Sequence, residues 1–220
     1  PNKLAKKSIF ERFKKSEERT IIDTAMQSAL EAVKQKKILP TPELQEIWDN
    51  IEAKIENGDA KIHEIGIGGR SKDQLIHEIK NLGNEISKDA LLMMEVMAQG
   101  EDFKASEKNQ NQVLKIIELS VEDLGFSEKA FAAKVFERAV ELGLQLCPAE
   151  IGPELRIKYQ NQKEGEDVYV GMMPIRIGYG QDALVFSVDR RHQKSLLSIG
   201  YFSFDFRWHM NHRVVFVMPN

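Results

Sequence analysis

The chain has 220 residues, of which 42% are hydrophobic and 30% charged, and it carries a net charge of −3 at pH 7. This composition is typical of a folded globular protein and excludes wholesale disorder. No apolar run in the sequence reaches the length of a membrane span, and the near-neutral charge balance excludes a globally basic nucleic-acid binder.

The charge is unevenly distributed along the chain. Residues 1–20 carry seven basic and three acidic side chains, residues 21–148 have a net charge of −8, and residues 149–220 have a net charge of +1. The single cysteine cannot form an internal disulfide. A lone thiol and the lack of a recognisable secretion signal favour a cytoplasmic location.

Residues 1–105 are predicted to form a helical region. Its basic, amphipathic start is expected to contact a protein partner or a second copy of the chain. Thr41 and Pro42 form a typical helix N-terminus, as an N-cap and a first helical residue. Two shorter helices, capped by Ser71 and Ser87, are predicted to form an αα-hairpin.

Residues 102–112 are polar and lack periodicity, which favours a domain boundary there. Residues 106–220 are then predicted to form a second domain: a strand, a helix capped by Ser127, and a mostly antiparallel sheet from Glu154 onward. The predicted fold class is therefore α+β, with an all-helical N-terminal part followed by a strand–helix–antiparallel β-sheet domain.

The stretch "LQLCPAEIGPEL" (144–155) holds the most reactive side chains of the sequence. Glu150 and Glu154 flank a Gly-Pro turn and could serve as acid and base if their surroundings differ. The alternative is that Glu154 points outward from a strand. Cys147 follows the end of a helix, where the dipole disfavours a thiolate, so a buried, unreactive thiol is favoured over a nucleophile.

His209 and His212 have the spacing H-x-x-H and are candidate metal ligands or partners of Glu150 in catalysis. Two ligands are too few to specify zinc, and the flanking strands favour a hairpin loop for the pair. The sequence therefore predicts no cofactor.

A glycine loop, Gly68 and Gly69 followed by Arg70 and Ser71, precedes a helix. Backbone N–H groups at such a position can bind an anion. No complete phosphate-binding pattern is present, and the alternative is a turn in which Ser71 only caps the helix.

Arg190, Arg191 and Lys194 form a basic hairpin tip that could contact nucleic acid. The region from residue 149 onward has a net charge of only +1, so nucleic-acid binding is the weaker interpretation. The leading functional prediction is a non-catalytic protein-interaction or regulatory module. The alternatives are a small hydrolase-type or metal-dependent enzyme using Glu150 with His209 and His212, and a nucleic-acid binder using residues 190–194 and the basic N-terminus.

Overall fold

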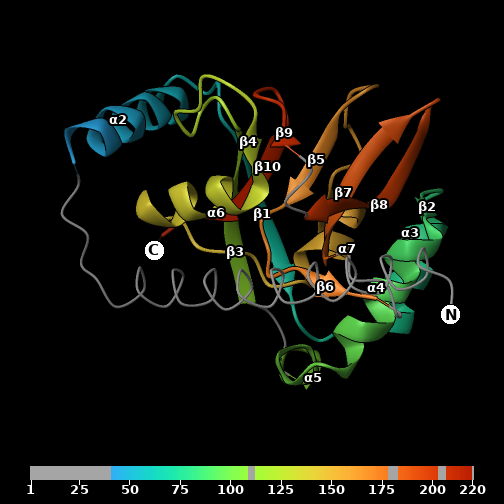
Figure 1. Cartoon of the computed structure of the whole chain (residues 1–220). Helices are drawn as coiled ribbons and strands as arrows, with labels where there is room; N and C mark the ends of the chain where they lie inside the picture. The colour runs from blue at the N-terminus through green and yellow to red at the C-terminus, as the bar shows by residue number, and fades with distance from the viewer. Residues whose placement is uncertain (1–40, 109–111, 178–182, 203–206, 220) are drawn as a thin grey trace, which may run out of the picture. The chain divides into compact units, whose positions relative to one another are not determined.

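The computed structural model describes residues 41–108, 112–177, 183–202 and 207–219, which belong to one compact unit beginning at Pro40 (Figure 1). The basic N-terminal segment, for which the sequence predicted partner contacts, lies outside the described residues. An all-helical N-terminal part is therefore not supported: the described part of residues 1–105 contains helices from residue 42 onward, but also two strands.

The described residues form a mixed α/β structure around one large sheet. In spatial order, seven of its strands are β1 (Lys61–Ile67), β3 (Gln112–Ser120), β10 (Arg213–Val217), β5 (Asp167–Val170), β7 (Ala183–Arg191), β8 (Lys194–Phe202) and β2 (Glu85–Ile86). An additional strand, β6 (Ile175–Arg176), pairs with β7 outside this order. A separate short ladder joins β4 (Ala130–Phe131) to β9 (Arg207–Trp208). The sheet is mostly antiparallel, as predicted, and its parallel pairs are β10 with β5 and β2 with β8.

Three helices begin where the sequence predicted them. In α2 (Pro42–Glu56), the side chain of Thr41 accepts a hydrogen bond from the backbone of Leu44. Ser71 and Ser87 cap α3 (Lys72–Asn81) and α4 (Lys88–Gln99) in the same way. Each cap satisfies a backbone N–H that the first helical turn leaves without a partner.

A strand lies inside the region that was predicted to be helical. β1 pairs antiparallel with β3, so residues on both sides of the predicted boundary at 102–112 belong to the same sheet. Within that segment, α5 (Glu101–Lys108) is helical. The exposed residues of β1 alternate with more buried ones, which is the signal of a strand that covers one face of a core.

A helix, α7 (Ile151–Lys158), replaces the strand predicted from Glu154 onward. Pro153 is compatible with it because the first turn of a helix has no intrahelical partners for its N–H groups. All residues from Ile151 to Arg156 are buried, so the helix shows no polar face from which its period could be read. The strand prediction was wrong for this reason.

The helix predicted after Ser127 also begins later than expected. α6 (Ala132–Glu141) starts after Phe131, which makes no side-chain cap hydrogen bond, and β4 occupies the residues just before it. Arg207 of β9 pairs with Phe131 across the short ladder. This pairing keeps the residues just before α6 in an extended conformation.

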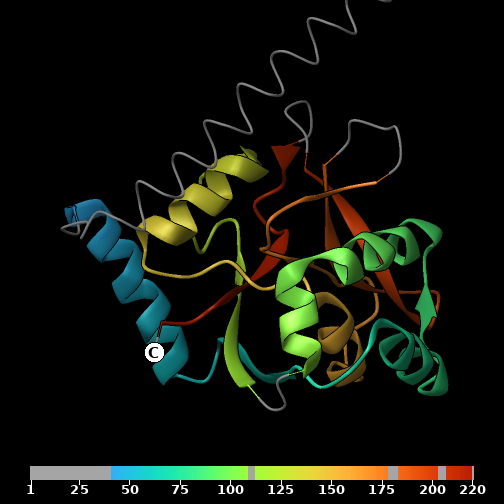
Figure 2. The same ribbon diagram turned by 90° about the horizontal axis from the view of Figure 1, so that it is seen from below.

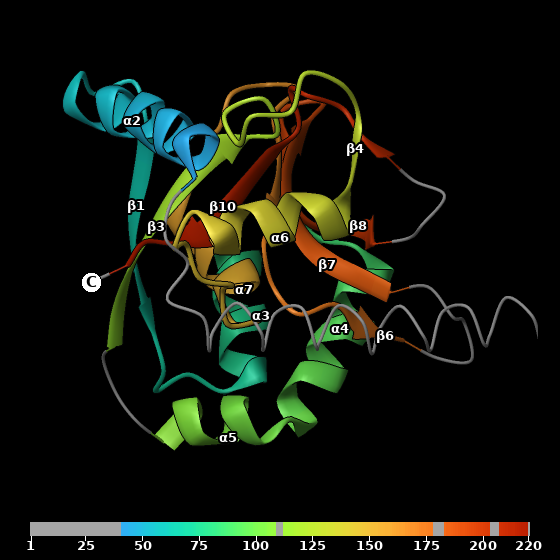
Figure 3. The same ribbon diagram turned by 60° about the vertical axis from the view of Figure 1, so that its left-hand side comes forward.

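The helices α7 and α6 cover opposite faces of the sheet (Figures 2 and 3). On one face, Gly152 of α7 lies so close to Phe186 that an added Cβ would be 2.5 Å from the ring carbon Cγ. On the other face, the ring of Phe136 in α6 meets that of Phe216 edge-on, with 5.7 Å between centroids. This layering places α7, with its glutamates, between the sheet and helix α3.

Candidate functional site

The two glutamates of the stretch 144–155 lie one helical turn apart at the start of α7. Positions i and i+4 share a helix face, so both carboxylates point toward the end of β1 and the loop after it. Each residue is only 3% exposed. The fold thus buries an acidic pair that the sequence placed near a solvent-facing turn.

The carboxylate of Glu150 is held by two donors from distant parts of the chain. Its Oε1 accepts a hydrogen bond from the backbone N–H of Gly68 (2.8 Å), and its Oε2 accepts one from Oγ of Ser106 (2.6 Å). The backbone N–H of Gly69 donates to the carbonyl of Ser106 at 3.0 Å. Gly68 has a φ of 90°, a conformation that glycine adopts without strain.

The glutamate one turn later is paired differently. Oε2 of Glu154 lies 3.0 Å from a guanidinium nitrogen of Arg70, while its buried Oε1 has no hydrogen-bond partner among the described residues. Burial raises the pKa of Glu154 to about 7, and Glu150 and Glu78 add to the shift, whereas Arg70 opposes it. This carboxyl group can therefore hold or release a proton near neutral pH.

Two sets of residues that the sequence assigned to separate sites meet here. The acid–base candidates Glu150 and Glu154 bind the anion-binding candidates Gly68 and Arg70. Ser71 is engaged in a capping box with Gln74. Gly68 and Arg70 are thus bound by carboxylates of the same chain, and Gly69 by a backbone carbonyl, in the place where an external anion was predicted.

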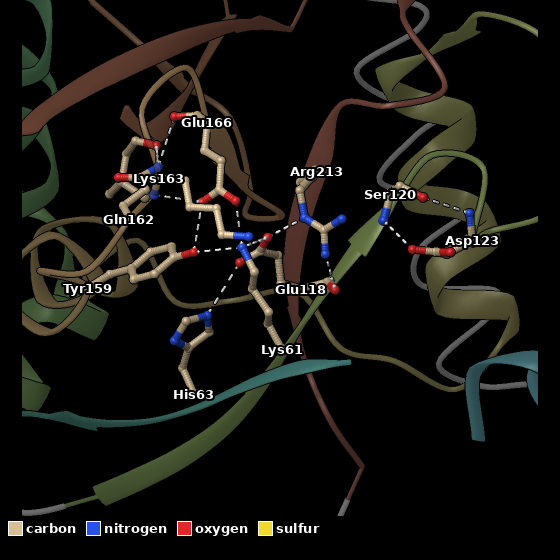
Figure 4. A network of polar contacts seen from close by, with 11 residues as sticks. Lys61, His63, Glu118, Ser120, Asp123, Tyr159, Gln162, Lys163, Glu166 and Arg213 are labelled. Carbon is tan, nitrogen blue, oxygen red and sulfur yellow. Dashed lines mark hydrogen bonds and ion pairs between the residues drawn. The ribbon is translucent and has the colours of Figure 1, made fainter. Parts of the chain in front are cut away.

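A second buried network lies at the other end of β1 (Figure 4). The side chain of Glu118, on β3, is fully buried and forms an ion pair with Arg213 of β10. Lys61 and His63 of β1 each approach it to 3.4 Å. Burial would raise the pKa of Glu118, but the contacts with His63, Arg213 and Lys61 outweigh burial and lower it.

The same network continues to the end of α7. Nζ of Lys61 lies 2.8 Å from both the hydroxyl of Tyr159 and a carboxylate oxygen of Glu166, and the Tyr159 hydroxyl donates to Glu166 at 3.0 Å. Burial works to lower the pKa of Lys61, but these hydrogen bonds, with the charge of Glu118, raise it above its usual value. The lysine is therefore a fixed cation and no candidate general base.

A buried arginine joins α7 to the sheet. Arg156 is fully buried and donates to Oε1 of Gln162 at 2.7 Å, to the carbonyl of Asp189 at 3.3 Å and to the carbonyl of Tyr159. Gln162 in turn donates to the carbonyl of Val188 at 2.8 Å. Burial lowers the pKa of Arg156 to about 10, so it stays charged at neutral pH beside the carbonyl end of the helix.

The structure does not bring the two candidate histidines to Glu150. The rings of His209 and His212 lie 5.4 Å apart, and the carbonyl of His212 accepts from Val121, just beyond the end of β3. Glu150 binds Gly68, next to the strand end where Ile67 pairs with Gln112. Nine residues of extended chain separate these ends, roughly 30 Å.

The thiol of Cys147 is buried in the sheet layer. Its Sγ donates to the carbonyl of Val215 at 3.5 Å, and its backbone forms an isolated bridge with Met172. Burial raises the pKa of the thiol, so it stays protonated at neutral pH. A protonated, enclosed sulfur is a poor nucleophile.

The charges of the basic hairpin tip are balanced by nearby acids. Arg191 forms an ion pair with Asp167, and Lys194 pairs with Glu85 at 2.5 Å. Arg190 donates to the hydroxyl of Ser195 at 3.0 Å. The tip therefore presents less uncompensated positive charge to a phosphate backbone than its sequence suggests.

The comparisons with known proteins identify no relative. No family model, no curated protein and no solved structure matches the chain. Within the described ranges, no group of three or more metal-ligating side chains is assembled. Across the same ranges, no helix combines the length and apolarity needed to cross a bilayer.

Sequence reasoning missed Glu118, Arg156 and Asp189, all of which are buried. Glu118 and Asp189 each carried a weak signal, because both are charged residues directly beside apolar runs, in "KIIELS" and "LVFSVD". A charge in such a run must find partners inside the fold.

Proposed function

We propose that this protein is a non-catalytic protein-interaction module that binds an extended segment of a partner along the free edge of β1. The edge of the sheet at β1, with which no described residue pairs, is the observation that carries the proposal. An unpaired strand edge offers a row of backbone donors and acceptors to another chain, which is how many interaction domains bind peptides.

The hydrogen-bonding register identifies the free groups of this edge. Met218 donates to the carbonyl of Lys115, so Lys115 faces β10 and, by alternation, Leu114 and Ile116 face β1. Their partners on β1 are the odd-numbered residues. The N–H and C=O groups of Ile62, Glu64 and Gly66 therefore point outward, and no described residue pairs with them.

Apolar side chains lie beside these free groups. Ile62 is 40% exposed, and Val113, which lies opposite Gly66 on β3, is 61% exposed. The strand contains no proline and no bulge, the usual devices that block an edge. An added strand would gain backbone hydrogen bonds and cover both apolar side chains.

The other functional predictions have less support. The hydrolase interpretation needs Glu150 beside His209 or His212, and these lie at opposite ends of the β1–β3 ladder. The nucleic-acid interpretation needs free charge at the hairpin tip, where Arg191 and Lys194 are paired with acids.

The proposal is tested by selecting peptides from a random library displayed on phage against the folded chain. We expect enriched peptides with alternating apolar residues, and slower hydrogen exchange at the amides of Ile62, Glu64 and Gly66 when such a peptide is bound. Glu64→Pro removes one outward N–H without touching the β1–β3 ladder, so it should abolish binding. Glu64→Ala is the matched control, because it removes the same carboxylate and keeps the N–H.

Peptides that bind Glu64→Pro as well as they bind the unaltered chain would refute the proposal, as would protection of another surface or a selection without enriched peptides. A doubled mass in sedimentation that Glu64→Pro abolishes would support use of the edge, with a second copy of the chain as its partner.

A further inference from the structure

A second group of polar side chains lies on the sheet face opposite α7. Tyr169 of β5 pairs with Ser187 of β7, so Tyr169, Ser187 and Asp189 share this face. Trp208 of β9 and His212, just before β10, both contact the ring of Tyr169. This group is independent of the β1 edge and contains no residue of the network around Glu118.

The ring of Tyr169 organises this group. It stacks on Trp208 with 4.8 Å between centroids and an interplanar angle of 22°, and it lies 5.4 Å from the ring of His212. Gly200 of β8 makes room for it, because a Cβ there would be 2.4 Å from Cδ1 of Tyr169. The aromatic side chains are thus fixed in place before any ligand arrives.

Two carboxylates face each other in this group, and a cation forms an ion pair with one of them. Asp167 and Asp189 are directly paired across β5 and β7, an arrangement that is unfavourable for like charges. Arg191 neutralises Asp167. Asp189 is 5% exposed, and its Oδ1 has no hydrogen-bond partner among the described residues. Asp189 itself forms no ion pair among the described residues, although the buried charge of Arg156 acts on it from beside its carbonyl.

Two further buried atoms of this group lack partners. The indole Nε1 of Trp208, a residue that is fully buried, has none among the described residues, and neither has Nδ1 of His212. A buried donor or acceptor without a partner destabilises the folded state. Three such atoms around one aromatic ring indicate a site that a ligand completes.

We propose that this face of the sheet binds a small organic cation, an ammonium or guanidinium group, with Asp189 as its counter-charge. The carboxylate of Asp189, which forms no ion pair among the described residues, matches one positive charge on the ligand. Trp208 can only donate, so the same ligand carries a hydrogen-bond acceptor that the indole N–H reaches. The aromatic wall of Tyr169 and Trp208 excludes water from this pairing and thereby strengthens it.

The test uses free L-arginine and its neutral isostere L-citrulline as probes. The Trp48→Phe variant leaves Trp208 as the single tryptophan, so its indole N–H gives one assignable NMR signal. L-arginine should shift this signal in a saturable way, and L-citrulline should not. Equal shifts with both compounds, no shift with either, or an equal shift with magnesium chloride would overturn the proposal.

A pair of variants locates the site. Asp189→Asn keeps the size of the side chain and removes its charge, and it should weaken the L-arginine effect about tenfold or more. Asp59→Asn, the same change at an exposed aspartate, is the control and should leave the effect unchanged. An unchanged response in folded Asp189→Asn would refute the assignment. If that variant does not fold, the two probes still decide the proposal on the Trp48→Phe chain.

Discussion

Two acidic pairs of this protein show opposite solutions to the burial of a carboxylate. Glu150 and Glu154 lie one turn apart on α7, whereas Asp167 and Asp189 lie opposite each other on neighbouring strands. Each pair has one member bound to an arginine, Arg70 or Arg191. The other members differ: both oxygens of Glu150 accept hydrogen bonds, whereas Oδ1 of Asp189 has no described partner.

The carboxylates of Glu150 and Asp189 therefore differ in what they contribute to the stability of the fold. Glu150 connects three segments, α7, the loop after β1 and α5, so its hydrogen bonds hold secondary structure together. Among the described residues, Oδ1 of Asp189 makes no such connection. A buried carboxylate whose two oxygens both have partners contributes to stability, whereas a buried carboxylate oxygen without a partner costs stability.

The largest expected effect tests the first half of this comparison. Glu150→Ala leaves the N–H of Gly68 and the hydroxyl of Ser106 without their acceptor, and we expect a loss of about 3 kcal/mol in the free energy of unfolding, measured by urea titration. Glu128→Ala, at an exposed glutamate, is the control and should change it by less than about 0.5 kcal/mol. A loss below about 1 kcal/mol for Glu150→Ala would contradict its structural role.

A smaller effect is expected in how the free energy of unfolding depends on pH, because Glu154 titrates near neutral pH. Its pKa is raised to about 7 in the folded state, so the folded protein binds the proton more tightly than the unfolded chain does. Its contribution to stability is present below pH 4.5 and is lost as the pH rises through 7, by about 2 kcal/mol after allowing for the partly exposed Arg70.

The measurement is a series of urea titrations from pH 4.5 to 8 on the unaltered chain and on Glu154→Gln. The variant has no proton to release, so its stability should vary less over this range. Parallel curves for the two proteins would show that Glu154 titrates normally.

The smallest effect has the opposite sign and concerns the second pair. Burial raises the pKa of Asp189 to about 6, with Asp167 adding to the shift, so at pH 7 the group is ionised at a cost. Asp189→Asn should therefore raise the free energy of unfolding at pH 7 by about 1 kcal/mol, and this gain should vanish below pH 4. A loss of stability at pH 7 would show that Asp189 serves the fold as Glu150 does.

The sequence predicted the elements whose signals are local. Thr41, Ser71 and Ser87 mark helix starts because an N-cap acts on backbone groups only two or three residues away. α7 was missed because it is buried on all sides and has no amphipathic period. For the same reason its glutamates were placed on a turn and a strand.

The candidate site could be predicted only as separate parts. The glycine loop and Glu150 were each identified from local patterns, but Gly68 and Glu150 are 82 positions apart, and only the fold joins them. Tyr169 of β5 and Trp208 of β9 meet across strands that are not neighbours in the sequence. No spacing rule connects such residues, so the pairing of these atoms follows from tertiary structure alone.

The position of β10 has a consequence for synthesis on the ribosome. β10 is the last strand in the described part of the sequence. It lies between β3 and β5 and joins the two halves of the sheet. Until residues 213–217 emerge from the exit tunnel, β3 can pair only with β1 and β5 only with β7, so one edge of each strand stays open. The nascent chain therefore exposes apolar strand edges until that point, the stage at which chaperones bind growing polypeptides.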